Sequence, residues 1–232
     1  MYCKIIFSLI VSILLSISQS VVAGVQIGGS RVVYDGNNQQ ASISVNNMDD
    51  KPYLIQSWVN KQMDFDDNDE TFITTPPLFR LDPHAQNSVR IIYTGKPLPQ
   101  DVESVYWLNI KTVPSTNHGT TNALLLSVKS RMKLFYRPAG IEGDVTTAYQ
   151  KLQFRQRNNL LYAYNPTPFS VSLYDIKVDQ RVLDKPPMVL PKHEVALHLA
   201  VLPGANIRWR AINDFGGIYP EQKKACDSTV GN

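Results

Sequence analysis

The segment at residues 122–138, NALLLSVKSRMKLFYRP, constrains the fold of this chain more than any other stretch. Its apolar residues Leu124, Leu126 and Val128 alternate with the polar Ser127 and Lys129, and this period of two predicts a β-strand. At about 3.3 Å per residue, a strand of this length would span on the order of 45 Å, well beyond the usual range. We therefore expect a strand that either bridges two sheets or leaves part of its edge open to another chain.

Shorter β-like runs fill the chain before this segment, and turn residues separate them. They cover residues 25–27, 30–34, 41–46, 53–59, 72–74, 75–81, 88–93 and 104–110. Pro76 and Pro77 predict that the run at 75–81 lies at a sheet edge, and Trp58 is a predicted core residue. Seven or eight short strands within about 110 residues are typical of an immunoglobulin-like β-sandwich.

A second region follows the RPAG sequence at residues 137–140, which predicts a hinge. The β-like pattern then resumes, with runs at 152–155, 160–164, 169–178, 188–190, 194–199 and 207–212. We therefore predict an all-β chain of two domains, residues 24–138 and residues 139–232, of which the second is the smaller.

The first 23 residues predict a secretory signal peptide. The basic Lys4 precedes an apolar run at residues 5–17, and the small residues at 21–23 suit cleavage before Gly24. The apolar run is short for a membrane span, although an uncleaved anchor is the alternative. We expect export of a protein that is not embedded in a membrane. Cleavage would remove Cys3 and leave Cys226, a relic or a weakly exposed thiol, so no internal disulfide could hold either domain.

Neither the charge nor the motifs indicate an enzyme or a nucleic-acid-binding protein. The formal charge of +3 falls to +2 without Lys4, which is too little to indicate a nucleic-acid surface. His193 and His198 are five residues apart, whereas the zinc-protease helix motif needs a spacing of four. The acidic segment at 64–70 lacks the glycine that a calcium loop requires. We therefore expect no catalytic residue, cofactor or metal.

Two basic residues, Arg31 and Lys133, lie inside apolar runs. Basic residues in strands usually face water. The alternative is that both cations reach one cleft and bind a carboxylate through charge-assisted hydrogen bonds. Leu124, Leu126 and Val128 also have two interpretations. They belong either to a buried core strand or to an edge strand whose alternate side chains fill the pockets of a partner.

Several motifs in order make the chain resemble the periplasmic pilus-assembly chaperones of the bacterial chaperone–usher family. They are GSRVVY at 29–34, TPP with FRL at 75–81, LPQDVESVYWLNIKTVP at 98–114, KLFYRP at 133–138 and NDFGG at 213–217. Val102 departs from the family pattern, which usually has a charged residue or Gln there. The short, cysteine-free stretch between Val113 and Ala123 resembles the short-loop subclass, which is associated with rod-like fimbriae.

The resemblance implies two immunoglobulin-like domains in a boomerang or L-shaped arrangement. It implies that Arg31 and Lys133 anchor the C-terminal carboxylate of a pilus subunit. The residues that it implies for the strand donated to the subunit's incomplete sandwich are Leu124, Leu126 and Val128. The charged trio that it implies as an interdomain salt bridge is Glu103, Arg137 and Asp214.

The function implied by the resemblance is that of a periplasmic chaperone. Such a protein binds, folds and caps fimbrial (pilin) subunits by donor-strand complementation, and it delivers them to an outer-membrane usher. A different class of protein has the same kind of fold, namely an exported structural or adhesive surface protein such as a fimbrial subunit. A subunit should carry its own donor arm and usually a disulfide, and the mature N-terminus of this chain shows neither.

Overall fold

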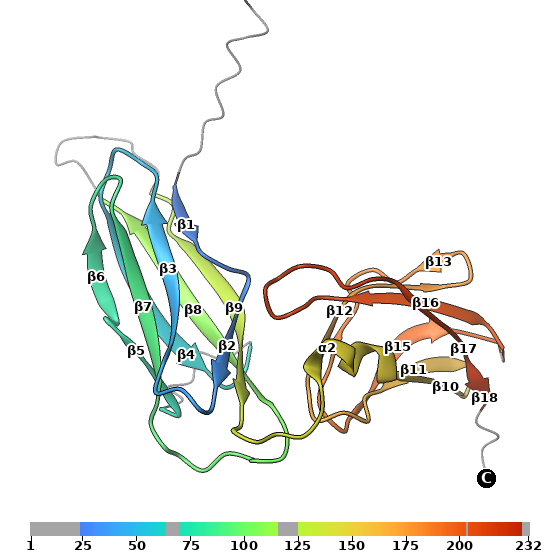
Figure 1. Cartoon of the computed structure of the whole chain (residues 1–232). Helices are drawn as coiled ribbons and strands as arrows, with labels where there is room; N and C mark the ends of the chain where they lie inside the picture. The colour runs from blue at the N-terminus through green and yellow to red at the C-terminus, as the bar shows by residue number, and fades with distance from the viewer. Residues whose placement is uncertain (1–23, 64–69, 116–124, 203, 229–232) are drawn as a thin grey trace, which may run out of the picture.

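The computed structural model describes residues 24–63, 70–115, 125–202 and 204–228. It contains two β-sandwiches that lie at an angle to each other (Figure 1). The predicted all-β fold with two immunoglobulin-like domains is therefore confirmed.

Strands β1 to β9 build the N-terminal domain. One sheet has the order β1-β3-β7-β5, and the facing sheet has the order β2-β9-β8-β4-β6. β6 lies at the edge, as its two preceding prolines predicted. The bounds are β1 (Val25–Ile27), β2 (Arg31–Asp35), β3 (Ala41–Asn47), β4 (Tyr53–Asn60), β5 (Phe72–Thr75), β6 (Leu78–Leu81), β7 (Gln86–Tyr93), β8 (Ser104–Pro114) and β9 (Val128–Arg137).

The alternation along β4 decides which of its residues enter the core. Ile55, Ser57 and Val59 are buried in the sandwich, so Trp58 points to the outer face, where it is half-buried. There the Lys129 ammonium lies 4.8 Å from the centroid of the indole ring. The prediction that Trp58 is a core residue is therefore wrong, because the period of two assigns it to the opposite face from its neighbours.

One end of the N-terminal core is aromatic. Neighbouring rings in this cluster have centroids between 4.9 and 6.5 Å apart. Such packed rings contribute more to stability than their buried area alone, and two of them belong to β2 and β9. They therefore hold these two strands firmly against the sandwich. The members are Tyr34, Phe72, Tyr93, Tyr106 and Tyr136.

A short helical segment and strands β10 to β18 build the C-terminal domain. Its sheets have the orders β15-β11-β10-β18 and β13-β12-β16-β17, and β14 also pairs with β12. The sequence did not predict the helix, although the Asp144 carboxylate caps it by accepting from the Thr146 N–H. The bounds are α2 (Val145–Ala148), a 3₁₀ turn (Tyr149–Lys151), β10 (Gln153–Arg157), β11 (Leu160–Tyr164), β12 (Val171–Val178), β13 (Arg181–Val182), β14 (Met188–Val189), β15 (Glu194–Ala200), β16 (Asn206–Ala211), β17 (Gln222–Ala225) and β18 (Asp227–Ser228).

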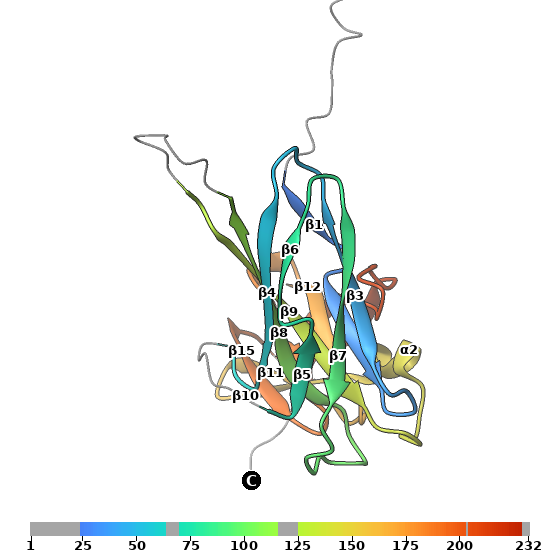
Figure 2. The same ribbon diagram turned by 90° about the vertical axis from the view of Figure 1, so that its left-hand side faces the viewer.

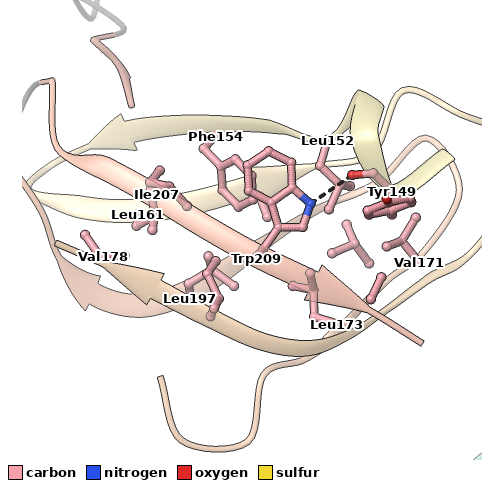
Figure 3. Close-up of a cluster of buried hydrophobic side chains, with 14 of the residues drawn as sticks. Tyr149, Leu152, Phe154, Leu161, Val171, Leu173, Val178, Leu197, Ile207 and Trp209 are labelled. Carbon is pink, nitrogen blue, oxygen red and sulfur yellow. Dashed lines mark hydrogen bonds between the residues drawn. The ribbon is translucent and has the colours of Figure 1, made fainter. Parts of the chain in front are cut away.

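Trp209 of β16 lies at the centre of the C-terminal core (Figure 3). Its indole Nε1 donates to the Tyr149 carbonyl at 2.9 Å, and its ring centroid lies 4.7 Å from that of Phe154. Cys226 belongs to the same core and is 4% exposed. Of the two interpretations of Cys226, the weakly exposed thiol is therefore wrong, and the burial leaves the interpretation as a relic open. Hydrophobic burial and not a disulfide holds this domain together.

The loop between β16 and β17 reaches back to the N-terminal domain (Figure 1). Gly216 in this loop has a φ of +85°, and a Cβ there would lie 2.7 Å from Ser30 Oγ. Glycine therefore permits both the backbone conformation and the close approach of the loop. Within the described parts of the chain, no helix has the length and apolar character needed to cross a membrane.

Candidate cleft and strand-edge site

The two predicted anchor residues lie side by side. β2 and β9 are parallel, and their register places Arg31 opposite Lys133. Because Met132, Leu134 and Tyr136 are buried in the sandwich, the alternate positions of β9 point away from the core. Both cations therefore lie on the outer face of the sheet, where they contact the C-terminal domain. Arg31 and Lys133 are called the anchor pair below.

The Lys133 ammonium is partly buried between the domains. Its Nζ donates to Ser172 Oγ of β12 at 3.0 Å. Burial, and then the positive charge of Arg31, lower the pKa of Lys133 from 10.5 to about 8. In the described part of the chain, no carboxylate lies within ion-pair distance of this ammonium. The site therefore keeps a cation whose charge is not neutralised by a direct partner.

The Arg31 guanidinium is only partly satisfied. One terminal nitrogen, NH1, donates to the Ile212 carbonyl at 3.2 Å, and the guanidinium carbon lies 5.5 Å from the centroid of the Phe135 ring. Burial lowers the pKa of Arg31, whereas the charge of Asp214 acts to raise it. The buried Nε has no acceptor among the described residues. A buried donor without an acceptor is costly, so an anion at this position would be favoured.

One groove includes a member of the anchor pair in its lining, and a second groove includes a residue on the neighbouring strand. One, with a volume of about 540 Å³, is lined by Arg31, Val33 and the almost fully exposed Phe215 among others. The other, of about 430 Å³, is lined by Trp107 and Leu190 among others, and Trp107 is the β8 residue opposite Lys133. Two adjacent cations beside an open groove can bind a carboxylate at the end of a chain.

Part of the edge of β9 is open. β9 pairs with β8 from Val128 to Tyr136, but it pairs with β2 only from Lys133 to Arg137. The backbone at residues 128–132 thus has one edge that no other described strand covers. Figure 2 shows the paired ends of β8 and β9 projecting away from the body of the domain. An open edge of this kind can pair with a strand of another chain.

The predicted donated strand is only partly a strand. β9 begins at Val128 and not at residue 122, and residues 125–127 have no regular structure. The physical reason is that the pairing with β8 ends at Thr112 opposite Val128, and a strand needs a neighbour for its backbone hydrogen bonds. Leu126 and Val128 are 68% and 58% exposed, which excludes a core strand here. Leu124 lies outside the described residues.

The predicted charged trio lies together at the junction of the domains. Arg137 Nε donates to Glu103 Oε1 at 2.8 Å, and the two terminal nitrogens of Arg137 donate to Asp214 at 2.8 and 3.2 Å. The Glu103 side chain is only 1% exposed, and those of Arg137 and Asp214 are 20% and 29% exposed. Glu103, Arg137 and Asp214 are called the hinge brace below.

The hinge brace includes backbone contacts that the sequence did not reveal. The Glu103 N–H donates to the Pro168 carbonyl at 2.9 Å, and Glu103 Oε2 accepts from the Ser170 N–H at 2.7 Å. Burial raises the pKa of Glu103, although Arg137 and the Ser170 N–H act to lower it. Each oxygen of this buried carboxylate thus has a donor, one from each domain.

The other sequence candidates do not form a site. His198 has a φ of +51° and is exposed, and no group of three His, Cys, Asp or Glu residues in the described chain could hold a metal ion. Residues 64–69 of the acidic segment lie outside the described residues.

Comparison with known families identifies the class of protein that this fold and site define. Residues 24–142 match the N-terminal domain model, and residues 147–223 the C-terminal domain model, of the pili assembly chaperone PapD. The chain therefore belongs to the PapD family of pilus-assembly chaperones.

The chain also resembles individual members of this family along nearly its whole length. It is 41% identical over 220 residues to the probable fimbrial chaperone LpfB of Escherichia coli O157:H7, covering 92% of this chain and 94% of the relative. Among solved structures, the Salmonella enterica complex of SafA pilin with the SafB chaperone matches with a TM-score of 0.79 and 32% identity, covering 89% of this chain and 98% of the other. The periplasmic chaperone SfaE matches with a TM-score of 0.74 and 32% identity, covering 89% of this chain and all of the other.

Proposed function

We propose that this chaperone binds fimbrial subunits by donor-strand complementation and passes them to an outer-membrane usher. In this proposal the anchor pair holds the C-terminal carboxylate of the subunit, and the segment from Leu124 through Leu126 to Val128 supplies the apolar side chains of the donated strand. The hinge brace keeps the two domains at the angle that forms the site. The chain takes part in no catalytic step.

The observation that carries this proposal is the position of the anchor pair at the end of the open strand edge. Lys133 is the residue of β9 at which pairing with β2 begins, and the open edge lies immediately before it. A carboxylate bound there would fix the register of a strand that pairs with residues 128–132. Each apolar side chain buried against a subunit would add on the order of 1.5–3 kcal/mol to the binding free energy. The register of the paired strands matters because it decides whether these side chains enter the groove of the subunit.

The proposal includes export to the periplasm. It assigns residues 1–23 to a cleaved signal peptide and divides the mature chain into domains at residues 24–138 and 139–232. Support comes from the basic and apolar pattern of the first residues and from SfaE, a structural relative that is a periplasmic chaperone. The alternative, a structural or adhesive surface protein, is not favoured, because the family models and the relatives that match along nearly the whole chain are those of fimbrial chaperones.

The experiment is recovery of the tagged chain from a periplasmic extract, with identification of the subunits that are recovered with it. Lys133→Ala should abolish recovery of the subunits and leave the protein folded. Lys111→Ala is the matched control, because Lys111 lies on the same outer face of the sheet and on the strand next to β9. Normal subunit recovery with Lys133→Ala would refute the anchoring role.

A further inference from the structure

The outer face of the β13-β12-β16-β17 sheet continues from the anchor pair along the C-terminal domain. Ser172 lies at its beginning, since the Ser172 hydroxyl accepts from Lys133. Figure 1 shows β12 and β16 in the layer of this domain that borders the open side of the angle between the domains. The outward-facing residues Tyr174, Lys177, Arg208 and Lys223 on this sheet are called the cleft wall.

A β-bulge turns Tyr174 outward. The register between β12 and β16 shifts between Leu173 and Asp175, so that Leu173 pairs with Ala211 and Asp175 with Arg210. Tyr174 is the extra residue, and it is 45% exposed. Bulges occur next to functional sites because they redirect a side chain.

The bulge is held by an ion pair that also supports the tyrosine ring. Arg210 binds Asp175 in a bidentate manner, with contacts of 2.5 and 3.1 Å, and its guanidinium carbon lies 5.0 Å from the centroid of the Tyr174 ring. This hydrogen bonding lowers the pKa of Asp175, so the pair stays charged at neutral pH. Tyr174 is thus an exposed aromatic surface on a fixed support.

Beyond Tyr174, three cations lie in one row across three neighbouring strands. Lys177 of β12 is opposite Arg208 of β16, and Arg208 is opposite Lys223 of β17. Like charges directly opposite each other destabilise a sheet. Arg208 lies 4.0 Å from Glu221, whereas neither lysine has a carboxylate within ion-pair distance among the described residues. Bound carboxylates would therefore neutralise this row more fully than the acidic residues of the chain do.

We infer that the cleft wall is a second contact surface for the fimbrial subunit, at which Tyr174 packs against an apolar side chain and the row of cations faces carboxylates. This inference rests on the proposed function and extends it to the C-terminal domain. Lys177 lies five positions after Ser172, which places the row on the order of 15 Å from the anchor pair. A subunit held by its C-terminal carboxylate at the anchor pair is the partner whose surface continues along this wall.

The test uses the full exported chain with its tag and the subunit recovered in the preceding experiment. Immobilised complexes are washed at increasing NaCl concentrations, and the subunit that remains bound is quantified. The variant Lys177→Glu/Lys223→Glu reverses two charges of the row. Its control, Lys151→Glu/Lys185→Glu, makes the same change in net charge at exposed lysines outside the wall.

With Lys177→Glu/Lys223→Glu, we expect about tenfold less bound subunit at moderate salt and a weaker dependence on salt, because charges at an interface govern both. The control should behave like the natural chain. Tyr174→Ser should reduce the retention of the subunit about threefold with an unchanged salt dependence. If Tyr174→Ser does not fold, the lysine variant alone tests the inference.

Two outcomes would overturn the inference. The first is equal retention by the lysine variant and its control. The second is that the natural chain, but not the lysine variant, sediments with vesicles that contain phosphatidylglycerol, while the lysine variant retains as much subunit as the natural chain. That result would mean that the cleft wall binds lipid and not the subunit. Failure of the proposed function is distinct, because subunits would then be recovered normally with Lys133→Ala at every salt concentration.

Discussion

The anchor pair and the hinge brace each include a partly buried cation on strand β9, but only the cation of the hinge brace has carboxylate partners. Lys133 and Arg137 lie four residues apart on the outer face of β9. Arg137 binds two carboxylates at 2.8 Å, and these contacts raise its pKa despite the opposing effect of burial. Lys133 donates to a hydroxyl, and burial together with the positive charge of Arg31 lowers its pKa to about 8. The charge of Arg137 is neutralised within the chain, whereas the charge of Lys133 has no carboxylate within ion-pair distance among the described residues.

In the proposed function, this difference separates a structural element, the hinge brace, from a binding element, the anchor pair. Breaking a satisfied buried network is costly, because each removed group leaves another without a partner. Removing a buried cation that has no counterion relieves a desolvation cost. Substitutions at the two places should therefore change the stability of the free protein in opposite directions, although both should reduce its ability to bind a subunit.

The largest effect on stability is expected for Glu103→Ala. This change leaves Arg137 with Asp214 alone and removes the acceptor of the Ser170 N–H. The free energy of unfolding should fall by about 3–5 kcal/mol, as measured by urea denaturation followed by circular dichroism. Glu142→Ala, at an exposed carboxylate near the hinge, should change it by less than about 0.5 kcal/mol. Equal values for the two variants would show that the brace does not stabilise the chain.

A smaller effect of opposite sign is expected for Lys133→Met. Methionine has a similar length and no charge, so the free energy of unfolding should rise by about 1–2 kcal/mol, while recovery of subunits is lost. Lys111→Met, on the same face of the sheet, serves as the control and should retain subunits. Loss of stability on the scale of Glu103→Ala would mean that the two elements do not differ as described.

The pH dependence of the anchor follows from the lowered pKa of Lys133. Between about pH 8 and pH 10.5 the unfolded chain binds more protons at this residue than the folded chain does, so this group makes stability rise with pH in that window. Subunit binding should change in the other direction, because the proposed anchoring of a carboxylate needs the charged ammonium. Affinity measured by titration calorimetry should fall about tenfold between pH 7 and pH 9. An affinity that stays constant over this range would exclude a role for the Lys133 charge.

The sequence predicted the fold of two β-sandwiches, and it also predicted which residues form the anchor pair and the hinge brace. The fold follows from alternating runs and turn residues, which are local signals. The residues of the hinge brace came from the family motifs, because no periodicity could bring Glu103 next to Asp214. The anchor pair was also visible as two basic residues inside apolar runs. The backbone contacts of Glu103 with Pro168 and Ser170 had no signal in the sequence at all.

Two other predictions were wrong, because the face that a side chain occupies and the residue at which a strand begins both depend on the neighbouring strands. Trp58 has the large apolar side chain that is typical of a core residue, but its position in the alternation of β4 puts it on the outer face. Alternation also predicted a strand from residue 122, whereas β9 begins at Val128, where β8 provides a partner. The bulge at Tyr174 depends likewise on the register between two strands, which the sequence of either strand alone does not fix.

The smallest effect on the free protein is expected for Leu126→Asp, which should sharpen the distinction between binding and stability further. Leu126 is 68% exposed, so its replacement should change the free energy of unfolding by less than about 0.5 kcal/mol. If Leu126 inserts into the subunit, the same change should remove the protection of the bound subunit against added protease. Leu125→Asp is the matched control, because the neighbouring leucine is also exposed and lies at the alternate position of an extended segment. Protection that is equally weakened by both variants would contradict insertion of alternate side chains and would instead indicate a general apolar contact.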